Sequence, residues 1–323
     1  MLRVSEQIKC ESPIISVAMI TYNHESYITQ AIESVLMQQV AFEIEIVIGE
    51  DCSTDKTGEI VNHYASLYPI IIRTIDRQRN VGVSKNFSET LCLCRGKYIA
   101  TMEGDDYWTD PLKLDKQVKF IEQNTDCVMC FHNSIIEKYG PDNRLVDRRP
   151  FYRTTPQSLL KFEDFAGGFY PHTSSCLIQN VKSNFIPLFD GTIPCFTKPL
   201  IYCVLAKGGF AAFMTDIMSV YRIHEGGIYS CIGSVRQLTM SNTGLLLCRK
   251  HFTVKTQRTI FTLQLIDNYI SLLRIHIRDR NFLGLLIVVR AILQLLIAPP
   301  SYTAFRRVLE RCMHYTSIKP KIS

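Results

Sequence analysis

Several features that would place this chain in a familiar class are missing from its sequence. It contains neither the GxxxxGK loop that cradles phosphates in many nucleotide-binding proteins nor the GxGxxG turn of dinucleotide-binding folds. It begins without the apolar stretch of a secretory signal peptide. Its one CxxC pair, Cys127 and Cys130, has no second pair to complete a four-cysteine zinc site. These absences indicate that a helix N-terminus is not the main device for holding phosphates, and they argue against a secreted disulfide scaffold and a four-cysteine zinc site.

Charge of neither sign dominates the chain. The 36 basic and 30 acidic residues give a net charge of +6, too small to indicate nucleic-acid binding. Twelve cysteines lie mostly within apolar runs, which is typical of buried thiols in a reducing compartment. The hydrophobic fraction of 46% and the charged fraction of 20% exclude disordered and fibrous classes. We therefore expect a folded cytoplasmic protein that does not bind nucleic acid.

The first 135 residues alternate between strand-like and helix-like segments. Short apolar runs rich in β-branched residues predict strands, and apolar residues spaced three or four positions apart predict helices. Strands that alternate with helices indicate a parallel sheet covered on both faces, which is an α/β fold. The predicted strands are residues 14–21, 43–48, 70–75, 97–102 and 127–132, and the predicted helices are residues 27–37, 54–67, 87–94 and 112–123.

Polar residues gather in the loops that follow the first four predicted strands. These loops, residues 21–26, 49–55, 76–86 and 103–110, carry acids, amides and a glycine turn. Ligands of parallel sheets bind outside the carboxyl ends of the strands, where such loops meet. The conjunction of four polar loops therefore predicts one binding site at this edge of the sheet.

Two adjacent carboxylates, Asp105 and Asp106, stand at the end of the fourth predicted strand, with Glu103 just before them. Neighbouring carboxylates repel one another unless a cation lies between them. Oxygen ligands suit Mg²⁺ or Mn²⁺, which complete their coordination with phosphate oxygens and water. We favour a metal–diphosphate site; the alternative is a turn with a helix cap before Pro111.

Four motifs in this order resemble those of the family 2 glycosyltransferases. They are PIISVAMITYN at residues 13–23, EDCSTD at 50–55, NVG at 80–82 and EGDD at 103–106. The segment SVYRIHEGG at 219–227 also matches bacterial members, and the resemblance covers residues 13–230. It implies a GT-A fold, with a Rossmann-like, mostly parallel sheet flanked by helices. It also implies an inverting transfer of a sugar from a nucleotide-diphosphate donor, with Mg²⁺ or Mn²⁺ as cofactor.

The resemblance implies roles for individual residues. Asp106 would ligate the metal, Asp105 would lie beside the ribose or sugar hydroxyls, and Asp51 would bond the nucleoside base. Arg222 and His224 would lie near the phosphates; the alternative for these two residues is a surface turn before Gly226. The other implied substrate-binding residues are Thr21, Tyr22 and Glu25 at the nucleoside, and Asn80, Gly82 and Lys85 at the nucleotide and donor sugar.

An inverting transfer needs a general base that takes a proton from the acceptor hydroxyl. Family members carry an acid just before a helix in the second half, and here Thr197 stands at that position. A threonine cannot act as a base near neutral pH. The nearest upstream carboxylate, Asp190, is the predicted catalytic base, and the alternative is a turn residue in the sequence FDGT.

The middle of the chain carries two further expectations. Residues 139–156 are polar and basic with three prolines, which predicts a loop or lid. The run FYPHTSSCLI at 169–178 resembles the part of the family that faces donor and acceptor, so that His172, Thr173 and Ser174 are candidate acceptor contacts. A plain buried strand is the alternative for this run.

The basic charge is concentrated at the C-terminal end, where residues 249–323 hold 13 basic and 3 acidic residues. Residues 282–298 are nearly all apolar but are interrupted by Arg290, which makes them a marginal spanning helix. Apolar residues flanked by arginines fit a helix lying on an anionic membrane surface, here through residues 274–311. The alternative is a core-packed helical hairpin with solvated arginines.

Together these observations predict three parts: a nucleotide-sugar-binding half at 1–138, an acceptor-side half at 139–235, and a helical C-terminal region at 236–323. The predicted function is transfer of a hexosyl or N-acetylhexosaminyl group, from a UDP-sugar by family frequency, to a lipid-linked saccharide of a surface polysaccharide. The protein would then be peripheral to the inner face of the cytoplasmic membrane. The alternatives are a non-catalytic nucleotide-sugar-binding homologue and a peripheral membrane adaptor.

Overall fold

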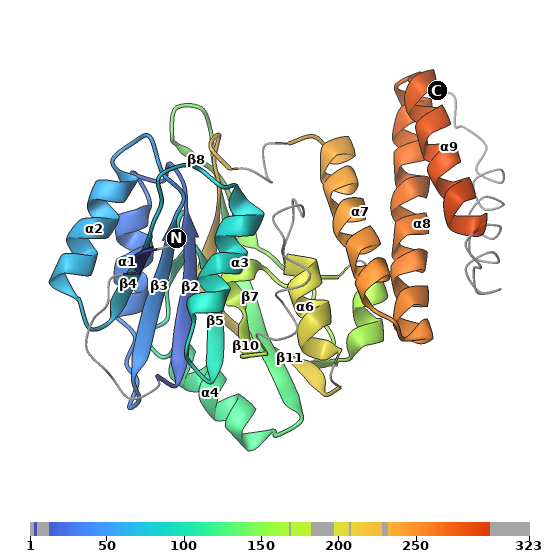
Figure 1. The fold of residues 1–323 in the computed structure, drawn as a ribbon. Coiled ribbons are helices and arrows are strands. Elements are labelled where there is room, and N and C mark those ends of the chain that lie inside the picture. The colour runs from blue at the N-terminus through green and yellow to red at the C-terminus, as the bar shows by residue number, and fades with distance from the viewer. Residues whose placement is uncertain are drawn as a thin grey trace. The chain divides into compact units, whose positions relative to one another are not determined.

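The computed structural model describes residues 3–4, 13–167, 169–181, 197–206, 208–227 and 232–297. The chain divides into two compact units. One comprises Met1–Phe162 with Tyr170–Ile232, and the other comprises Glu163–Phe169 with Gly233–Ser323. The first unit holds the sheet and the second is helical (Figure 1). Asp190 lies outside the described residues.

A mixed sheet runs through the first unit. Its strands are β1 (Arg3–Val4), β2 (Ile15–Thr21), β3 (Ile44–Glu50), β4 (Ile72–Asp76), β5 (Tyr98–Glu103), β6 (Tyr107–Trp108), β7 (Cys127–Tyr139), β8 (Leu145–Pro150), β9 (Leu159–Leu160), β10 (Leu177–Gln179) and β11 (Phe210–Ile223). The order is β1-β4-β3-β2-β5-β10-β7-β11-β6, with β8 on β7 and β9 on β11. Neighbours among β4, β3, β2 and β5 are parallel, as are β7 and β11, and antiparallel β10 joins the two groups. The predicted α/β architecture is confirmed.

Helices flank this sheet, and each predicted helix of the first 135 residues is present. Helix α1 shows why: Ile28, Ala31, Ile32 and Val35 recur at helical spacing and are all buried. Helix α3 begins four residues earlier than predicted, directly after Gly82. The helices of this unit are α1 (Ile28–Leu36), α2 (Thr57–Leu67), α3 (Val83–Leu93), α4 (Lys113–Gln123) and α6 (Thr197–Leu205), with short 3-10 turns at η1 (Phe162–Gly167), whose last residues belong to the second unit, and η2 (Thr173–Ser175).

Strand β2 lies at the centre of the core, and all seven of its residues are buried. Its register pairs Thr21 with Glu50 on one neighbour and Ile20 with Glu103 on the other. The strands are parallel, so the loops that follow β2, β3 and β5 leave the sheet side by side. This register brings together three of the polar loops that the sequence predicts to form one site.

The sequence predicted a loop or lid at residues 139–156, but the structure shows a strand there as well. They contain β8, which pairs antiparallel with β7 from Ile135↔Pro150 to Tyr139↔Leu145. Most of β8 is exposed at the edge of the sheet, and Pro150 is its last residue. Edge strands tolerate charged side chains and proline, which is why this strand has the composition of a loop. Cys127 and Cys130, in contrast, are buried free thiols in a strand, as predicted.

The second unit contains α7 (Ser234–His251), α8 (Lys255–Arg278) and α9 (Phe282–Ile297). Helix α8 packs against both α7 and α9, and Figure 1 shows the three helices side by side. Gly284 of α9 lies against the ring of His276 of α8, where a methyl group would fall 2.5 Å from Nδ1. Among the described helices, none combines the length and the apolar content needed to cross a membrane.

Candidate functional site

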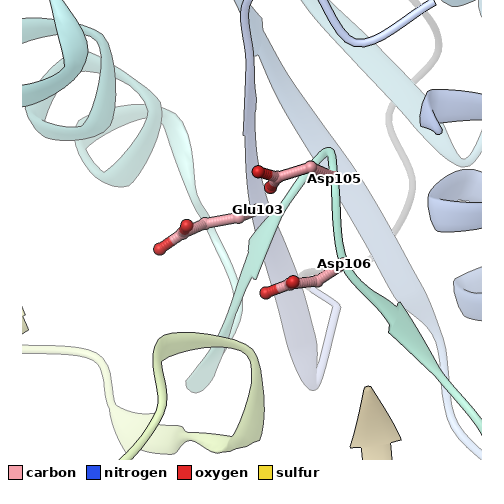
Figure 2. Close-up of side chains that lie close together, drawn as sticks. All are labelled: Glu103, Asp105 and Asp106. Atoms are coloured by element: carbon pink, nitrogen blue, oxygen red, sulfur yellow. The ribbon is translucent and has the colours of Figure 1, made fainter. Parts of the chain in front are cut away.

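Three carboxylates meet in the tight turn that follows β5. Glu103, Asp105 and Asp106 each offer an oxygen within 4.8 Å of the others. Figure 2 shows the three side chains projecting to the same side of the turn. The turn needs glycine at position 104, since a methyl group there would lie 2.6 Å from the Thr21 hydroxyl. The predicted carboxylate cluster therefore exists and stands beside the end of β2.

Asp106 is fully buried, and the protein engages both of its oxygens. Oδ2 accepts a hydrogen bond from the Ser174 hydroxyl over 2.6 Å and lies 3.2 Å from Nε2 of His172. Oδ1 accepts from the backbone N–H of Arg222 over 3.0 Å. Asp106 thus joins the turn to β11 and to the segment of η2, and each of its oxygens already accepts a hydrogen bond from the protein.

Asp105 is placed differently from its neighbour. Its Oδ2 lies 3.2 Å from Nε2 of His224 and 3.7 Å from Nε2 of His24. Burial alone would raise the pKa of Asp105, but the two histidines outweigh that effect and hold its pKa below the ordinary value. Its Oδ1 is buried and has no hydrogen-bond partner among the described residues. An uncommitted buried carboxylate oxygen is costly unless something binds it.

Glu103 completes the cluster from the last position of β5. Burial and the charges of Asp105 and Asp106 raise its pKa well above the ordinary value. Simultaneous ionisation of all three acids is therefore disfavoured in the protein alone. A divalent cation would relieve that repulsion, and the all-oxygen donor set suits Mg²⁺ or Mn²⁺. The residues present fit the metal that the sequence predicts.

The side chain of Arg222 holds the backbone of this turn in place. Its Nη1 donates to the backbone carbonyl of Asp105 over 2.8 Å, and its Nη2 donates to Gln30. The guanidinium carbon lies 5.2 Å from the ring centre of Tyr27 and 4.4 Å from that of Tyr107. The sequence placed Arg222 near phosphates, and the structure shows a buried side chain that holds the backbone beside Asp105.

Asp51 organises the loop that precedes α3. Its Oδ1 and Oδ2 accept from the backbone N–H groups of Val81 and Gly82, each over 2.9 Å. The Asn80 side chain also accepts from Gly82 N–H, over 3.0 Å. Gly82 has φ +87°, a backbone conformation that side chains with a Cβ rarely adopt. Burial raises the pKa of Asp51. Asp51, which the sequence predicts at the nucleoside, therefore also stabilises the loop that contains Asn80 and Gly82, two other predicted site residues.

The remaining predicted residues lie around these loops. The Thr21 hydroxyl is 3.2 Å from Nδ1 of His24, beneath the acidic turn. Glu25 accepts from the backbone N–H of Lys56 over 3.0 Å, which links the loops after β2 and β3. Tyr22 is half-buried in the same loop, and Lys85 is likewise half-buried on α3, with its Nζ 3.9 Å from Glu89.

The contacts of His24 and of the η2 segment with the acidic turn were not predicted from the sequence. His24 lies in the first polar motif, so its position was visible although its contact with Asp105 was not. His172 and Ser174, expected either as acceptor contacts or within a plain strand, both contact Asp106, and their role toward an acceptor stays a prediction. The hydroxyls of Thr173 and Thr197 are 3.0 Å apart, which places the first turn of α6 beside η2.

The arrangement, a mixed sheet with an acidic turn at the carboxyl ends of its parallel strands, is the GT-A fold of glycosyltransferases. Residues 16–179 match the family described as "Glycosyl transferase family 2". That match covers half of the chain, and the chain therefore belongs to this family. The family membership predicted from the four motifs is confirmed.

Relatives and solved structures agree with this assignment. An uncharacterized Mycobacterium tuberculosis protein is 36% identical over 66% of the chain, and the match spans only 60% of that relative. The putative teichuronic acid biosynthesis glycosyltransferase TuaG of Bacillus subtilis is 32% identical over 68% of the chain and 82% of its own length. Staphylococcus aureus TarS with UDP-GlcNAc aligns at TM-score 0.61 and 16% identity, covering 87% of this chain and 81% of that one. A Pyrobaculum calidifontis mannosyltransferase with GDP-Man and Mn²⁺ aligns at TM-score 0.56 and 14% identity, covering 95% and 81%.

Proposed function

We propose that this protein is an inverting glycosyltransferase that uses a nucleotide-diphosphate sugar, with UDP as the nucleotide. The group moved would be a hexosyl or N-acetylhexosaminyl group, and the acceptor a lipid-linked saccharide of a surface polysaccharide. The observation that carries the proposal is the acidic turn after β5, where Asp105 keeps a buried oxygen uncommitted. TarS in complex with UDP-GlcNAc shares the fold, which supports a donor of this class.

We assign the metal first to Asp105 and Glu103. The sequence favoured Asp106, but both oxygens of Asp106 are engaged by Ser174, His172 and Arg222, so we assign it to holding the turn in place. A bound Mg²⁺ or Mn²⁺ would neutralise the charge that develops on the departing diphosphate. The Mn²⁺ bound by the structurally similar mannosyltransferase supports this choice of cofactor.

The donor would lie across the loops after β2, β3 and β4. We propose Asp51 and the residues around Thr21 for the nucleoside, because these side chains stand where parallel strands present ligands. Gly82 leaves open space in front of its backbone, with no atom within 4 Å of the position that a methyl group would take, so a diphosphate or sugar could approach closely. The full set is Thr21, Tyr22, Glu25, Asp51, Asn80, Gly82 and Lys85, with His224 at the phosphate end.

Inverting transfer would proceed by attack of an acceptor hydroxyl on the anomeric carbon, opposite the diphosphate. The new bond joins the hydroxyl oxygen to that carbon, the bond from carbon to diphosphate oxygen breaks, and the hydroxyl proton passes to a base. We propose Asp190 as that base. The contact between Thr173 and Thr197 supports an acceptor site near the start of α6, where the family carries its acid.

We place the reaction at the inner face of the cytoplasmic membrane. TuaG, named for teichuronic acid biosynthesis, supports a role in surface polysaccharide synthesis. A lipid-linked acceptor would require contact between the protein and the membrane surface. The exposed apolar side chains of the second unit support such contact.

A second candidate function is a non-catalytic nucleotide-sugar-binding homologue, favoured by Thr197 at the position of the expected acid. One experiment separates the possibilities: thermal unfolding with UDP, GDP and dTDP, each with Mn²⁺ or EDTA, for wild type and Asp105→Asn. A ligand at ten times its Kd adds about 1.4 kcal/mol of stability. Metal-dependent stabilisation lost in the variant supports the donor site, and subsequent turnover separates enzyme from homologue. Absence of any nucleotide effect would contradict both candidates and favour a membrane adaptor.

A further inference from the structure

Helix α9 presents a broad apolar surface to solvent. Six large side chains on it are 45–76% exposed, and they occupy an arc of roughly 160° at 100° per residue. The opposite side carries Gly284, Val288 and Leu295, which are buried. The exposed set, named here the α9 apolar face, consists of Phe282, Leu283, Leu286, Ile287, Val289 and Leu293. Packing against α8 therefore uses one side of α9 and leaves the other without a partner among the described residues.

Positive charge surrounds this face. Arg274, Arg278 and Arg280 precede it in the chain and Arg290 lies within it, and all four are exposed. The acid among residues 274–297 is Asp279, which pairs with Arg278 over 2.8 Å. Both partners of that pair are largely exposed, and such surface pairs exchange partners at little cost. An anionic surface therefore complements the charge around the α9 apolar face.

A pocket between the start of α7 and the end of α8 adds a polar element. Its lining includes Ser234, Arg236 and Thr239 from α7, Ile275 and Arg278 from α8, and Asp279, the exposed partner of Arg278. Two arginine side chains and two hydroxyls suit the oxygens of a phosphate group. Asp279, Arg280 and Asn281 separate Arg278 from the first residue of α9, so the pocket and the apolar face are near one another in the chain.

The position of Arg290 and the length of α9 favour a membrane surface over a second copy of the chain or a membrane-spanning arrangement as the partner of the α9 apolar face. A second copy packed on α9 with the two helices in register, parallel or antiparallel, would bring the two Arg290 side chains together, because Arg290 stands at the middle of α9. The two Arg290 side chains would then repel each other. The described length of α9 also falls short of a membrane crossing, because 16 residues extend about 24 Å and a bilayer core needs about 30 Å.

We propose that α9 lies flat in the headgroup layer of an anionic membrane, with its apolar face toward the acyl chains and a lipid phosphate in the Arg236–Arg278 pocket. In this position Arg290 extends its aliphatic part through the interface and keeps its charge at the headgroups. The inference deepens the proposed function, since it rests on that function for the lipid-linked acceptor and names the surface that brings the protein to it.

The test is flotation of the full-length protein with vesicles of phosphatidylcholine alone or with about 25% phosphatidylglycerol, at low and high salt. We expect salt-sensitive binding to the anionic vesicles. Leu286→Ser combined with Ile287→Ser should weaken that binding roughly a hundredfold. Arg236→Gln combined with Arg278→Gln should weaken it roughly twenty-five-fold on anionic vesicles and leave binding to neutral vesicles unchanged. Leu67→Ser with Ile70→Ser, at exposed apolar positions of the other unit, is the matched control.

Three outcomes would overturn the inference. Wild type that floats with neither vesicle contradicts it. Equal binding by wild type and the Leu286/Ile287 variant removes the role of the α9 apolar face. A dimer in light scattering that the same variant dissociates, without vesicle binding, assigns the face to a second copy. Nucleotide binding is followed separately by thermal shift with UDP and Mn²⁺. Protein that binds nucleotide but not vesicles sinks this inference alone, and protein that binds vesicles but no nucleotide sinks the proposed function.

Discussion

The backbone N–H of Arg222 donates to Oδ1 of Asp106 over 3.0 Å, across 116 positions of sequence. The same arginine reaches the carbonyl oxygen of Asp105 with its side chain. Strand β11 thus fixes both residues of the acidic turn. Both oxygens of Asp106 accept hydrogen bonds from the protein, whereas Oδ1 of Asp105 has no hydrogen-bond partner among the described residues.

Asp106→Asn and Asp105→Asn should therefore fail in different ways. In Asp106→Asn the new amide nitrogen would face the Arg222 N–H or the Ser174 hydroxyl with a donor, and a buried unsatisfied group costs about 1–3 kcal/mol of unfolding free energy. Asp105→Asn removes a charge from an oxygen that has no partner among the described residues, so its stability should change less while Mn²⁺-dependent nucleotide binding is lost. Urea unfolding and the thermal shift measure the two effects. Equal stability of both variants would contradict this division of roles.

Gly82→Ala should weaken both the fold and donor binding. Its positive φ disfavours any residue with a Cβ by about 1–2 kcal/mol. A backbone shift that relieved this strain would disturb the hydrogen bonds that the N–H groups of Val81 and Gly82 donate to Asp51. The matched control is Gly58→Ala within α2, where a methyl group meets ordinary contacts at 3.6 Å. That substitution should be neutral or stabilising by up to about 1 kcal/mol. If both variants unfold at the same urea concentration, the strain argument is wrong.

Lys113 gives a pH-dependent prediction. It is fully buried, donates to Gln117 over 2.7 Å and lies over the Trp108 ring, and burial lowers its pKa to about 7. The unfolded chain keeps the ordinary pKa near about 10.4, so it binds more protons than the native state between about pH 7 and pH 10. Stability from this group therefore rises with pH through that window, and its cost is greatest below about pH 7.

Lys113→Met should then raise the melting temperature, by more at pH 6 than at pH 9. Lys119→Met, at an exposed position of the same helix, controls for the general effect of removing a lysine. Thermal unfolding at pH 6, 7.5 and 9 checks the trend. A gain that grows with pH would contradict the assigned pKa direction.

Asp190→Asn should lower turnover by about 10²–10⁴-fold, the usual contribution of a general base, and leave nucleotide binding unchanged. The measurement is release of nucleoside diphosphate from the donor that the thermal shift identifies, with Glu163→Gln as the comparison. Unchanged turnover in Asp190→Asn would show that Asp190 is not the base. The next candidate to test would then be His172, whose Nε2 lies 3.2 Å from Oδ2 of Asp106.

The elements that the sequence predicted correctly are those whose signal is local. The β-branched run of β2 and the helical spacing of α1 each fit within a dozen residues, and both elements ended within two residues of expectation. Strand β8 was missed because an exposed edge strand needs no apolar alternation.

The acidic turn was predicted for the same local reason, since Asp105 and Asp106 are adjacent. The different contacts of the two carboxylates were not predictable, because Asp106 is held by Ser174, His172 and Arg222, all more than 60 positions away. Contacts at such separation leave no periodic trace in a single sequence.

The long-range tie between β11 and the acidic turn also bears on the order of folding. Contacts separated by more than a hundred residues close large loops, whose entropy must be overcome before they stabilise anything. The loops after β2 and β3, including the contact of His24 with Asp105, can form within the first half of the sheet, whereas the contacts of Asp105 with Arg222 and His224 form when β11 docks. The binding-competent turn would then be among the last parts of the chain to take shape, so that a partly folded chain would not capture a metal-bound donor prematurely.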